Sequence, residues 1–176
     1  MGARNFLIEG VSGTGKTTVA EELQRRGRHV VHGDRELALV GHPETGERLE
    51  RPGSLSAAEA VAWGHKHHVW DAGVVKALAT DVQHAETFFC GGSRNFRQLI
   101  DLFDKVFVLD VDLETLKRRL EGRPVGMFGG EPLERELIAR LHTTREDIPS
   151  DAVVIDASAP VARVVDEILG HCAYAR

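Results

Sequence analysis

The sequence predicts an α/β protein with a parallel β-sheet. Apolar runs at residues 6–9 and 29–33 are typical of buried strands, and residues 17–26 between them predict a helix, because apolar side chains recur there at helical spacing. A strand, a helix and a further strand in this order form a unit whose two strands run parallel. The 176 residues suit one domain over residues 1–176.

The segment between the first strand and the first helix carries a phosphate-binding pattern. Residues 10–17, Gly-Val-Ser-Gly-Thr-Gly-Lys-Thr, match G-x-x-x-x-G-K-[ST] without a mismatch. The glycines let the backbone wrap closely around an anion, and N–H groups of the loop and of the first helical turn then point at the phosphates. We expect a nucleoside triphosphate to be bound by Gly10, Ser12, Gly13, Thr14, Gly15, Lys16, Thr17 and Thr18.

Two side chains of this loop have separate expected roles. Lys16 would reach the β- and γ-phosphates as a mobile positive charge, and the Thr17 hydroxyl would bind Mg²⁺. The alternative is a chance glycine-rich turn. The strand before the loop and the lysine and hydroxyl within it argue against that alternative.

Composition narrows the class of protein. The net charge of −5 argues against a general nucleic-acid-binding surface. Two cysteines, Cys90 and Cys172, give no disulfide framework and suit a reducing compartment. A signal peptide and a bilayer-spanning apolar run are absent from the sequence, so we expect a cytoplasmic protein without a membrane partner. The sequence leaves the oligomeric state open.

Asp34 directly follows the second predicted strand. Ligands of open α/β sheets bind beyond the carboxyl ends of the strands, so Asp34 is expected to face the same crevice as the phosphate loop. There it would bind an acceptor hydroxyl, act as a base or hold a magnesium-bound water. The alternative is a helix cap near Arg35.

Residues 41–80 are expected to form an insert beside the acceptor site. Gly, Pro and charged residues dominate positions 41–54, which predicts a surface loop. Ser56 followed by Glu59 is typical of a capping box, so a helix is expected to begin there and to run to about residue 79.

The insert carries aromatic and histidine side chains. Trp63 and Trp70 would share one face of the expected helix, where they would either stack on a base or pack into the core. His65, His67 and His68 suggest a metal site, but the nearby sequence offers no Cys or carboxylate at a zinc-like spacing. A solvated polar face, or contacts with the acceptor, is therefore favoured.

The third predicted strand, residues 87–90, ends in a turn that points to a second binding element. Gly91 and Gly92 allow close approach of the backbone to a ligand, and the planar guanidinium of Arg94 suits phosphate or carboxylate. The alternative is a tight turn with Arg94 in a salt bridge. Further strands are expected at 105–111 and 151–156, and further helices at 95–103, from 113, at 132–146 and after Pro160.

A basic helix end is followed by a loop rich in Gly and Pro. Arg119 and Arg123 lie on this segment, and residues 122–132 are expected to form a hinged lid whose closure excludes water and brings arginines to the transferred phosphate. The alternative is a solvated basic face beside Glu114 and Glu121.

Taken together, the order of these motifs resembles the small P-loop kinases: shikimate, gluconate and adenylate kinase and related nucleoside or nucleotide kinases. The resemblance covers essentially the whole chain, although only the phosphate loop is a sharp motif. It implies a three-layer P-loop NTPase fold with a five-stranded parallel sheet in the order 2-3-1-4-5, a lid, and transfer of the γ-phosphoryl group of ATP with Mg²⁺. The group labelled nucleoside kinase looks similar.

The resemblance also implies roles for individual residues. On the acceptor side, Asp34 matches the acceptor-binding acid, and the acceptor-binding turn is matched by Gly91, Gly92 and Arg94. The lid arginines that contact adenine and phosphates are matched by Arg119 and Arg123. Arg145 resembles a second acceptor or phosphate arginine, and the segment from Ser158 to Pro160 resembles the loop that borders adenine. Cys90 departs from the pattern because many relatives carry an acid there, so Asp34 would take over the magnesium contact.

The function expected from the sequence is that of an ATP-dependent small-molecule kinase. Lys16, Asp34, Arg119 and Arg123 are the expected catalytic residues. A nucleoside is the first choice of acceptor because Trp63 or Trp70 could stack on a base, and a sugar acid or another hydroxylated metabolite is the alternative. A nucleotide-binding regulatory module without phosphotransfer is a third possibility.

Overall fold

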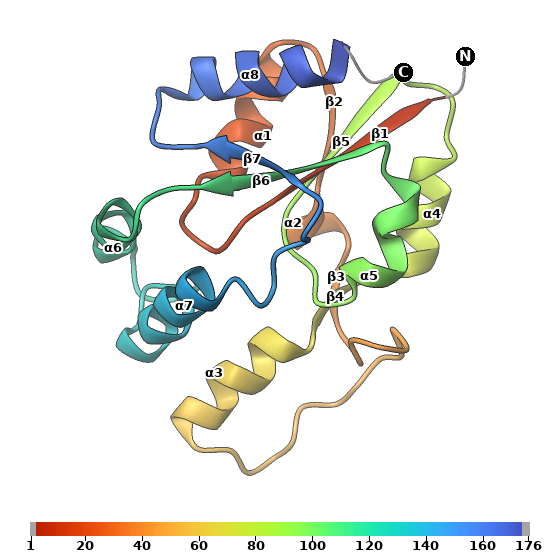
Figure 1. Cartoon of the computed structure of the whole chain (residues 1–176). Helices are drawn as coiled ribbons and strands as arrows, with labels where there is room; N and C mark the ends of the chain where they lie inside the picture. The colour runs from red at the N-terminus through yellow and green to blue at the C-terminus, as the bar shows by residue number, and fades with distance from the viewer. Residues whose placement is uncertain (1–2, 174–176) are drawn as a thin grey trace.

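The fold is described by a computed structural model that covers residues 3–173 (Figure 1). Its central sheet has five parallel strands in the order β2-β5-β1-β6-β7. Their bounds are Arg4–Glu9 for β1, His29–His32 for β2, Glu86–Cys90 for β5, Lys105–Asp110 for β6 and Val153–Asp156 for β7. Two further strands, β3 and β4, pair with each other, so counting the central strands alone gives the predicted order 2-3-1-4-5.

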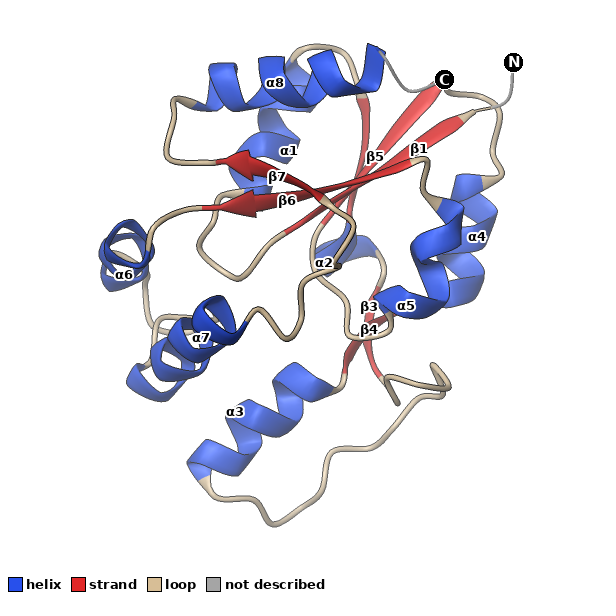
Figure 2. Cartoon of the chain, viewed as in Figure 1, coloured by secondary structure: helices blue, strands red, loops and turns tan. Residues whose placement is uncertain are grey.

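Helices cover both faces of the sheet, which is why its strands are apolar along their length (Figure 2). Within β1, Phe6 and Ile8 pack into one core and Leu7 packs into the other. The first core is shared with α1 (Lys16–Arg25), α6 (Leu113–Glu121), α7 (Pro132–Thr144) and α8 (Val161–Ala173), and the second with α4 (Ala72–Ala79) and α5 (Phe96–Leu99). The predicted three-layer α/β class is confirmed.

The insert differs from the single helix that the sequence predicted. The chain forms α3 (Ala57–Lys66), then the short strand β4 (His68–Trp70), and only then α4. Strand β4 pairs antiparallel with β3 (Ala38–Val40), which the sequence analysis did not foresee. The capping box of Ser56 and Glu59 begins α3 as predicted.

The physical reason for this correction has two parts, a strand partner for residues 68–70 and a helix cap directly after them. Val69 and Trp70 are residue types that favour strands, and β3 offers them a partner edge. Asp71 then caps a new helix, because its side chain accepts hydrogen bonds from the N–H groups of Gly73 and Val74. The expected helical face that joined Trp63 to Trp70 therefore does not exist.

Smaller differences concern the ends of elements. Gly33 begins the short helix α2 (Gly33–Glu36) instead of ending a strand, and the helix expected at 95–103 is split into α5 and a 3₁₀ turn, η1 (Ile100–Leu102). No helix within residues 3–173 has the length and apolar character needed to cross a membrane. Beyond the carboxyl ends of the central strands lie α3, α6 and α7, and the candidate site is there (Figure 1).

Candidate active site

The phosphate loop joins β1 to α1, and its shape depends on glycine. Gly13 has a φ of +100°, and a Cβ there would lie 2.8 Å from Cδ1 of Leu116. At Gly10, a Cβ would lie 2.7 Å from the carbonyl oxygen of Leu109. The backbone thus follows a path that a side chain would obstruct, and this close wrapping is what a chain of phosphates requires.

Lys16 begins α1 with its side chain directed back over the loop. Its Nζ donates to the carbonyl oxygens of Gly10 and Val11, the latter at 3.3 Å. Burial lowers the pKa of the Lys16 ammonium, although the nearby carboxylates of Glu9 and Asp34 oppose this shift. Because charge-assisted bonds to phosphate are stronger than bonds to carbonyl groups, this ammonium suits a triphosphate better than its present partners.

A cavity of about 810 Å³ lies along the phosphate loop, and we call it the loop cavity. All residues of 12–19 line it, Thr17 and Thr18 included, together with Arg35, which the sequence analysis did not single out. Beyond β7, it is lined by Ala157, Ala159 and Val161. The loop cavity therefore lies where a nucleotide is expected to bind, between the phosphate loop and the segment after β7.

The two residues predicted to border adenine are engaged elsewhere. The Ser158 hydroxyl donates to the Asp156 carboxylate at 2.6 Å, and the Pro160 carbonyl accepts from the N–H of Arg163 at 2.9 Å. The loop after β7 thus borders the loop cavity as predicted, but through the neighbours of Ser158 and Pro160.

The arginines predicted for the lid reach the loop cavity. Arg119 donates to the Thr14 carbonyl at 3.0 Å and to the Ala157 carbonyl at 2.8 Å. Arg123 donates to the Ser12 hydroxyl at 2.7 Å and also to the Phe128 carbonyl. Burial lowers the pKa of Arg123. Two guanidinium groups therefore line the loop cavity beside the phosphate loop.

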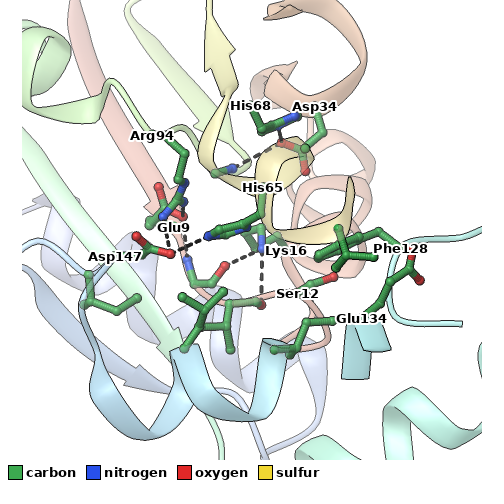
Figure 3. A pocket seen from close by; sticks show the side chains of 18 of the residues that line it. Glu9, Ser12, Lys16, Asp34, His65, His68, Arg94, Phe128, Glu134 and Asp147 are labelled. Carbon is green, nitrogen blue, oxygen red and sulfur yellow. Dashed lines mark hydrogen bonds and ion pairs between the residues drawn. The ribbon is translucent and has the colours of Figure 1, made fainter. Parts of the chain in front are cut away.

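A second cavity, of about 470 Å³, lies beneath α3 and beside α7, and we call it the insert cavity (Figure 3). Its volume falls within the range of about 300–1,000 Å³ that is usual for small-molecule sites. The residues that line both cavities are Ser12, Lys16, Asp34 and Phe128. A molecule in the insert cavity and a triphosphate in the loop cavity would therefore meet between Lys16 and Asp34.

Asp34 is held in this position by two hydrogen bonds. Its Oδ1 accepts from the N–H of Gly92 at 3.2 Å and lies 3.3 Å from Nε2 of His68. Burial alone would raise the pKa of the Asp34 carboxyl, but the bonds from His68 and Gly92 and the charge of Lys16 hold it below its usual value. The N-cap of α2 is His32, so the alternative that Asp34 caps this helix is wrong.

The glycines after β5 make room for this carboxylate. A Cβ at Gly91 would lie 2.9 Å from Asp34 Oδ1, and a Cβ at Gly92 would lie 2.7 Å from Glu9 Oε1. Gly92 also lines the insert cavity. The turn therefore packs closely against two carboxylates of the chain itself, and its approach to a ligand stays a prediction.

Arg94 points into the insert cavity and forms ion pairs there. Its Nη1 lies 2.7 Å from Oδ2 of Asp147, and its Nη2 lies 3.7 Å from Oε1 of Glu9. His65 from α3 lies 2.6 Å from the same Asp147 oxygen. Burial would raise the pKa of Asp147, but these two partners lower it below its usual value. The salt bridges expected as the alternative for Arg94 are observed, and its guanidinium also lines the cavity, so its binding of a ligand stays a prediction.

Three carboxylates of this cavity were missed by the sequence analysis: Glu9, Asp147 and Glu134, the last in the first turn of α7. Glu9 ends β1, and a charged residue closing an otherwise apolar strand directly before the phosphate loop was the available signal. Asp147 follows α7 in a loop without a recognisable pattern, so its position depends on tertiary structure.

The three histidines of the insert point to different partners. His65 contacts Asp147, His68 contacts Asp34, and buried His67 lies 3.1 Å from the Gly41 carbonyl. In the part of the chain that the structure describes, no three His, Cys, Asp or Glu side chains are grouped to hold a metal ion. A magnesium ion would therefore depend on the Thr17 hydroxyl together with phosphate oxygens.

Three further predicted residues lie away from this meeting point. Arg145 ends α7, and its Nη1 donates to Asp110 at 2.9 Å, so its guanidinium is committed outside both described cavities. Trp70 is 1% exposed and belongs to the core. Trp63 contacts the His67 ring, with a distance of 4.5 Å between centroids.

Cys90 occupies the strand end where the resemblance led us to look for an acid. It is buried, and burial raises the pKa of its thiol. A neutral thiol there adds no negative charge to the site, whereas Glu9 and Asp34 both stand beside Lys16.

Comparison with known proteins shows the family of the chain. The family model described as an AAA domain matches residues 7–136. A protein named gluconokinase from Gluconobacter oxydans (strain 621H) is 30% identical over 173 residues, which are 96% of this chain and 90% of that protein.

Two solved structures share the fold. A gluconokinase from Sinorhizobium meliloti 1021 has a TM-score of 0.55 at 21% identity, covering 97% of this chain and 91% of that one. Shikimate kinase from Aquifex aeolicus vf5 has a TM-score of 0.57 at 20% identity, covering 96% of each chain. The chain therefore belongs to the AAA domain family and is a small P-loop kinase of the shikimate and gluconate kinase type, an ATP-dependent phosphotransferase.

Proposed function

We propose that this kinase transfers the γ-phosphoryl group of ATP to a hydroxyl group of a small polyhydroxylated carboxylic acid, a compound of the sugar-acid class. The observation that carries the proposal is that Lys16 and Asp34 line both the loop cavity and the insert cavity. A triphosphate in the first and an acceptor in the second would have their reacting groups side by side.

Asp34 is the residue that prepares the acceptor. Because its pKa lies below the usual value, its carboxylate is ionised at neutral pH and can accept a hydrogen bond from the acceptor hydroxyl. Gly92 and His68 hold this carboxylate, so the hydroxyl oxygen is directed toward the phosphate. As that oxygen attacks, its proton passes to Asp34.

The phosphate side is prepared by cations. Lys16 neutralises charge on the transferred group, and Arg119 and Arg123 offer donors from the other wall of the loop cavity. The Thr17 hydroxyl would hold a magnesium ion, which supplies further charge neutralisation when bound. Each of these groups stabilises the transition state, in which charge develops on the phosphate, more than the bound substrates. Their removal is therefore expected to lower kcat.

The nucleoside that the sequence analysis placed first loses its supporting argument. That choice depended on Trp63 or Trp70 stacking on a base, but Trp70 is buried in the core and Trp63 contacts His67. Among the described residues that line the insert cavity, Phe128 is the one aromatic ring apart from two histidines. The insert cavity therefore offers little aromatic surface on which the base of a nucleoside could stack.

A sugar acid finds better partners. Arg51 lines the insert cavity from the exposed loop before α3, and within residues 3–173 it has no hydrogen bond to another residue, so its guanidinium is available for a carboxylate. Asp34 at the junction suits a hydroxyl. The relative named gluconokinase supports the same class.

A panel of acceptors tests this proposal. Purified protein with ATP and Mg²⁺ would be given D-gluconate and other sugar acids, shikimate, neutral sugars and nucleosides, and acceptor-dependent release of ADP would be measured. We expect a sugar acid to give the highest kcat/KM. Turnover of nucleosides alone would contradict the acceptor class, and no turnover of any compound would contradict the proposed transfer.

A further inference from the structure

The insert cavity contains a buried carboxyl group that the proposed transfer step does not use. Glu9 is the last residue of β1, and 2% of its side chain is exposed. Its Oε1 accepts a hydrogen bond from the N–H of Gly10 at 3.3 Å. Its Oε2 is buried and, among the residues that the structure describes, has no hydrogen-bond partner. Buried polar atoms of this kind mark places where a ligand supplies the missing partner.

The guanidinium beside it has an unused donor as well. Arg94 Nη1 lies 2.7 Å from Oδ2 of Asp147, but the alignment is outside hydrogen-bond geometry, and no other acceptor within residues 3–173 serves this nitrogen. The Arg94 side chain is 11% exposed and lines the insert cavity together with Glu9 (Figure 3). A carboxylate oxygen without a hydrogen bond and a guanidinium nitrogen whose one contact is an ion pair thus lie on adjacent side chains of one cavity.

The chemistry of this pair selects its ligand group. A hydroxyl donates one hydrogen bond and accepts another, so it complements both atoms at once. A ligand ammonium group would be repelled by Arg94 and Lys16, which both act electrostatically on Glu9. A ligand carboxylate would offer Glu9 Oε2 no proton. The other carboxylates of the cavity are already engaged. Asp147 contacts His65, Asp34 contacts His68, and Glu134 accepts hydrogen bonds from the N–H groups of Gly129 and Glu131.

We propose that Glu9 and Arg94 form a hydroxyl-binding subsite of the insert cavity, in which Glu9 accepts and Arg94 donates. The subsite binds an acceptor hydroxyl other than the one that is phosphorylated. Asp34 lines both cavities and therefore stands at the transfer point, whereas Glu9 lines the insert cavity alone of the two. This inference rests on the proposed function and specifies how the acceptor is oriented in it.

The orientation follows from the two ends of the cavity. The acceptor presents hydroxyl groups to Asp34 and to the Glu9–Arg94 pair, and its carboxylate is directed away from Glu9 toward Arg51. Specificity then depends on a hydroxyl that takes no part in the reaction, because a compound lacking it leaves Glu9 and Arg94 unpaired.

The test combines the Glu9→Gln variant with a series of singly deoxygenated analogues of the acceptor found in the panel. With the unchanged protein, removal of the hydroxyl that meets Glu9 is expected to raise the acceptor KM at least about tenfold. Glu9→Gln is expected to raise the KM of the parent acceptor by a similar factor. For the analogue that lacks the hydroxyl meeting Glu9, the KM of Glu9→Gln is expected to equal that of the unchanged protein. The KM for ATP should not change.

Glu86→Gln is the matched control. Glu86 lies on β5 of the same sheet, at the end remote from both described cavities, and is paired with Arg4 and Arg28. This variant is expected to leave the acceptor KM unchanged. Because burial raises the pKa of Glu9, its neutral replacement is also expected to keep or raise the Tm, which a purely structural role would not allow.

The outcomes separate the two proposals. An unchanged acceptor KM in Glu9→Gln, or a lower Tm with a changed KM for ATP, overturns the subsite while the proposed function stands. A wild-type protein that phosphorylates nothing in the panel overturns the proposed function, and the subsite with it.

Discussion

Arg123 donates a hydrogen bond of 2.7 Å from Nη1 to the hydroxyl group of Ser12. This bond joins the proposed lid, residues 122–132, to the phosphate loop. The same guanidinium also donates to the Phe128 carbonyl within the lid. Ser12, Arg123 and Phe128 all line the loop cavity.

Removing this guanidinium tests the proposed lid. We expect Arg123→Ala to lower kcat by about 10²-fold or more, because arginines of this kind act on the charge of the transferred phosphate. Arg118→Ala is the matched control and should retain full kcat, since Arg118 is exposed on α6 and its one hydrogen bond within residues 3–173 joins it to Thr115 of its own helix at 3.4 Å. Equal kcat values for the two variants would contradict a role for Arg123 in transfer.

Lys16→Ala is expected to abolish turnover and leave the fold intact. Burial lowers the pKa of Lys16, so the folded state bears a cost for this charge and removing it should not lower the Tm. Turnover assays and thermal unfolding on the same preparation measure both effects. The control Lys76→Ala, which changes an exposed residue of α4, should keep normal turnover. Wild-type activity in Lys16→Ala would contradict the proposed mechanism.

The pH dependence of stability should reflect the Asp147 contacts. Because Asp147 has a folded-state pKa below its unfolded value of about 3.9, its stabilising contribution is fully present above that pH and is lost as the pH falls through the folded-state pKa. We expect Asp147→Asn to lower the Tm at pH 7 and to weaken the decline in Tm below about pH 4. Asp151→Asn, in an exposed turn, should follow the wild-type curve.

Two Gly→Ala changes, one in the phosphate loop and one in α8, are expected to have opposite effects on stability. At Gly13, where φ is +100° and Leu116 lies 2.8 Å from the added Cβ, we expect a loss of about 1–3 kcal/mol in unfolding free energy. At Gly170, within α8 and with open space around the Cβ, we expect a gain of about 0.5–1 kcal/mol. Denaturant unfolding measures both, and a neutral Gly13→Ala would show that the loop tolerates a side chain.

The sequence was sufficient for the parts of the fold that depend on local pattern. The phosphate loop and the capping box of Ser56 and Glu59 are short-range signals, and each is observed where it was predicted. The order of the central strands came from the resemblance, and the observed pairing agrees with it.

The rest depends on contacts between distant segments. Residues 68–70 form a strand because β3 lies beside them, although their spacing also fits a helix. Asp147 enters the site from a loop that has no pattern of its own, where Arg94 and His65 meet it. Glu9 had a visible signal, a carboxylate closing an apolar strand, but its meaning depends on the cavity that other elements build over it.

The account depends most on the meeting of two cavities at Asp34, and ³¹P NMR of the reaction with ATP, Mg²⁺ and a sugar acid tests it most directly. We predict that the wild-type protein and the control Asp81→Asn, changed in the loop between α4 and β5, produce a new phosphomonoester signal as ADP appears. Asp34→Asn should form this product at least about 10²-fold more slowly. An Asp34→Asn variant as fast as the wild type would contradict the central claim.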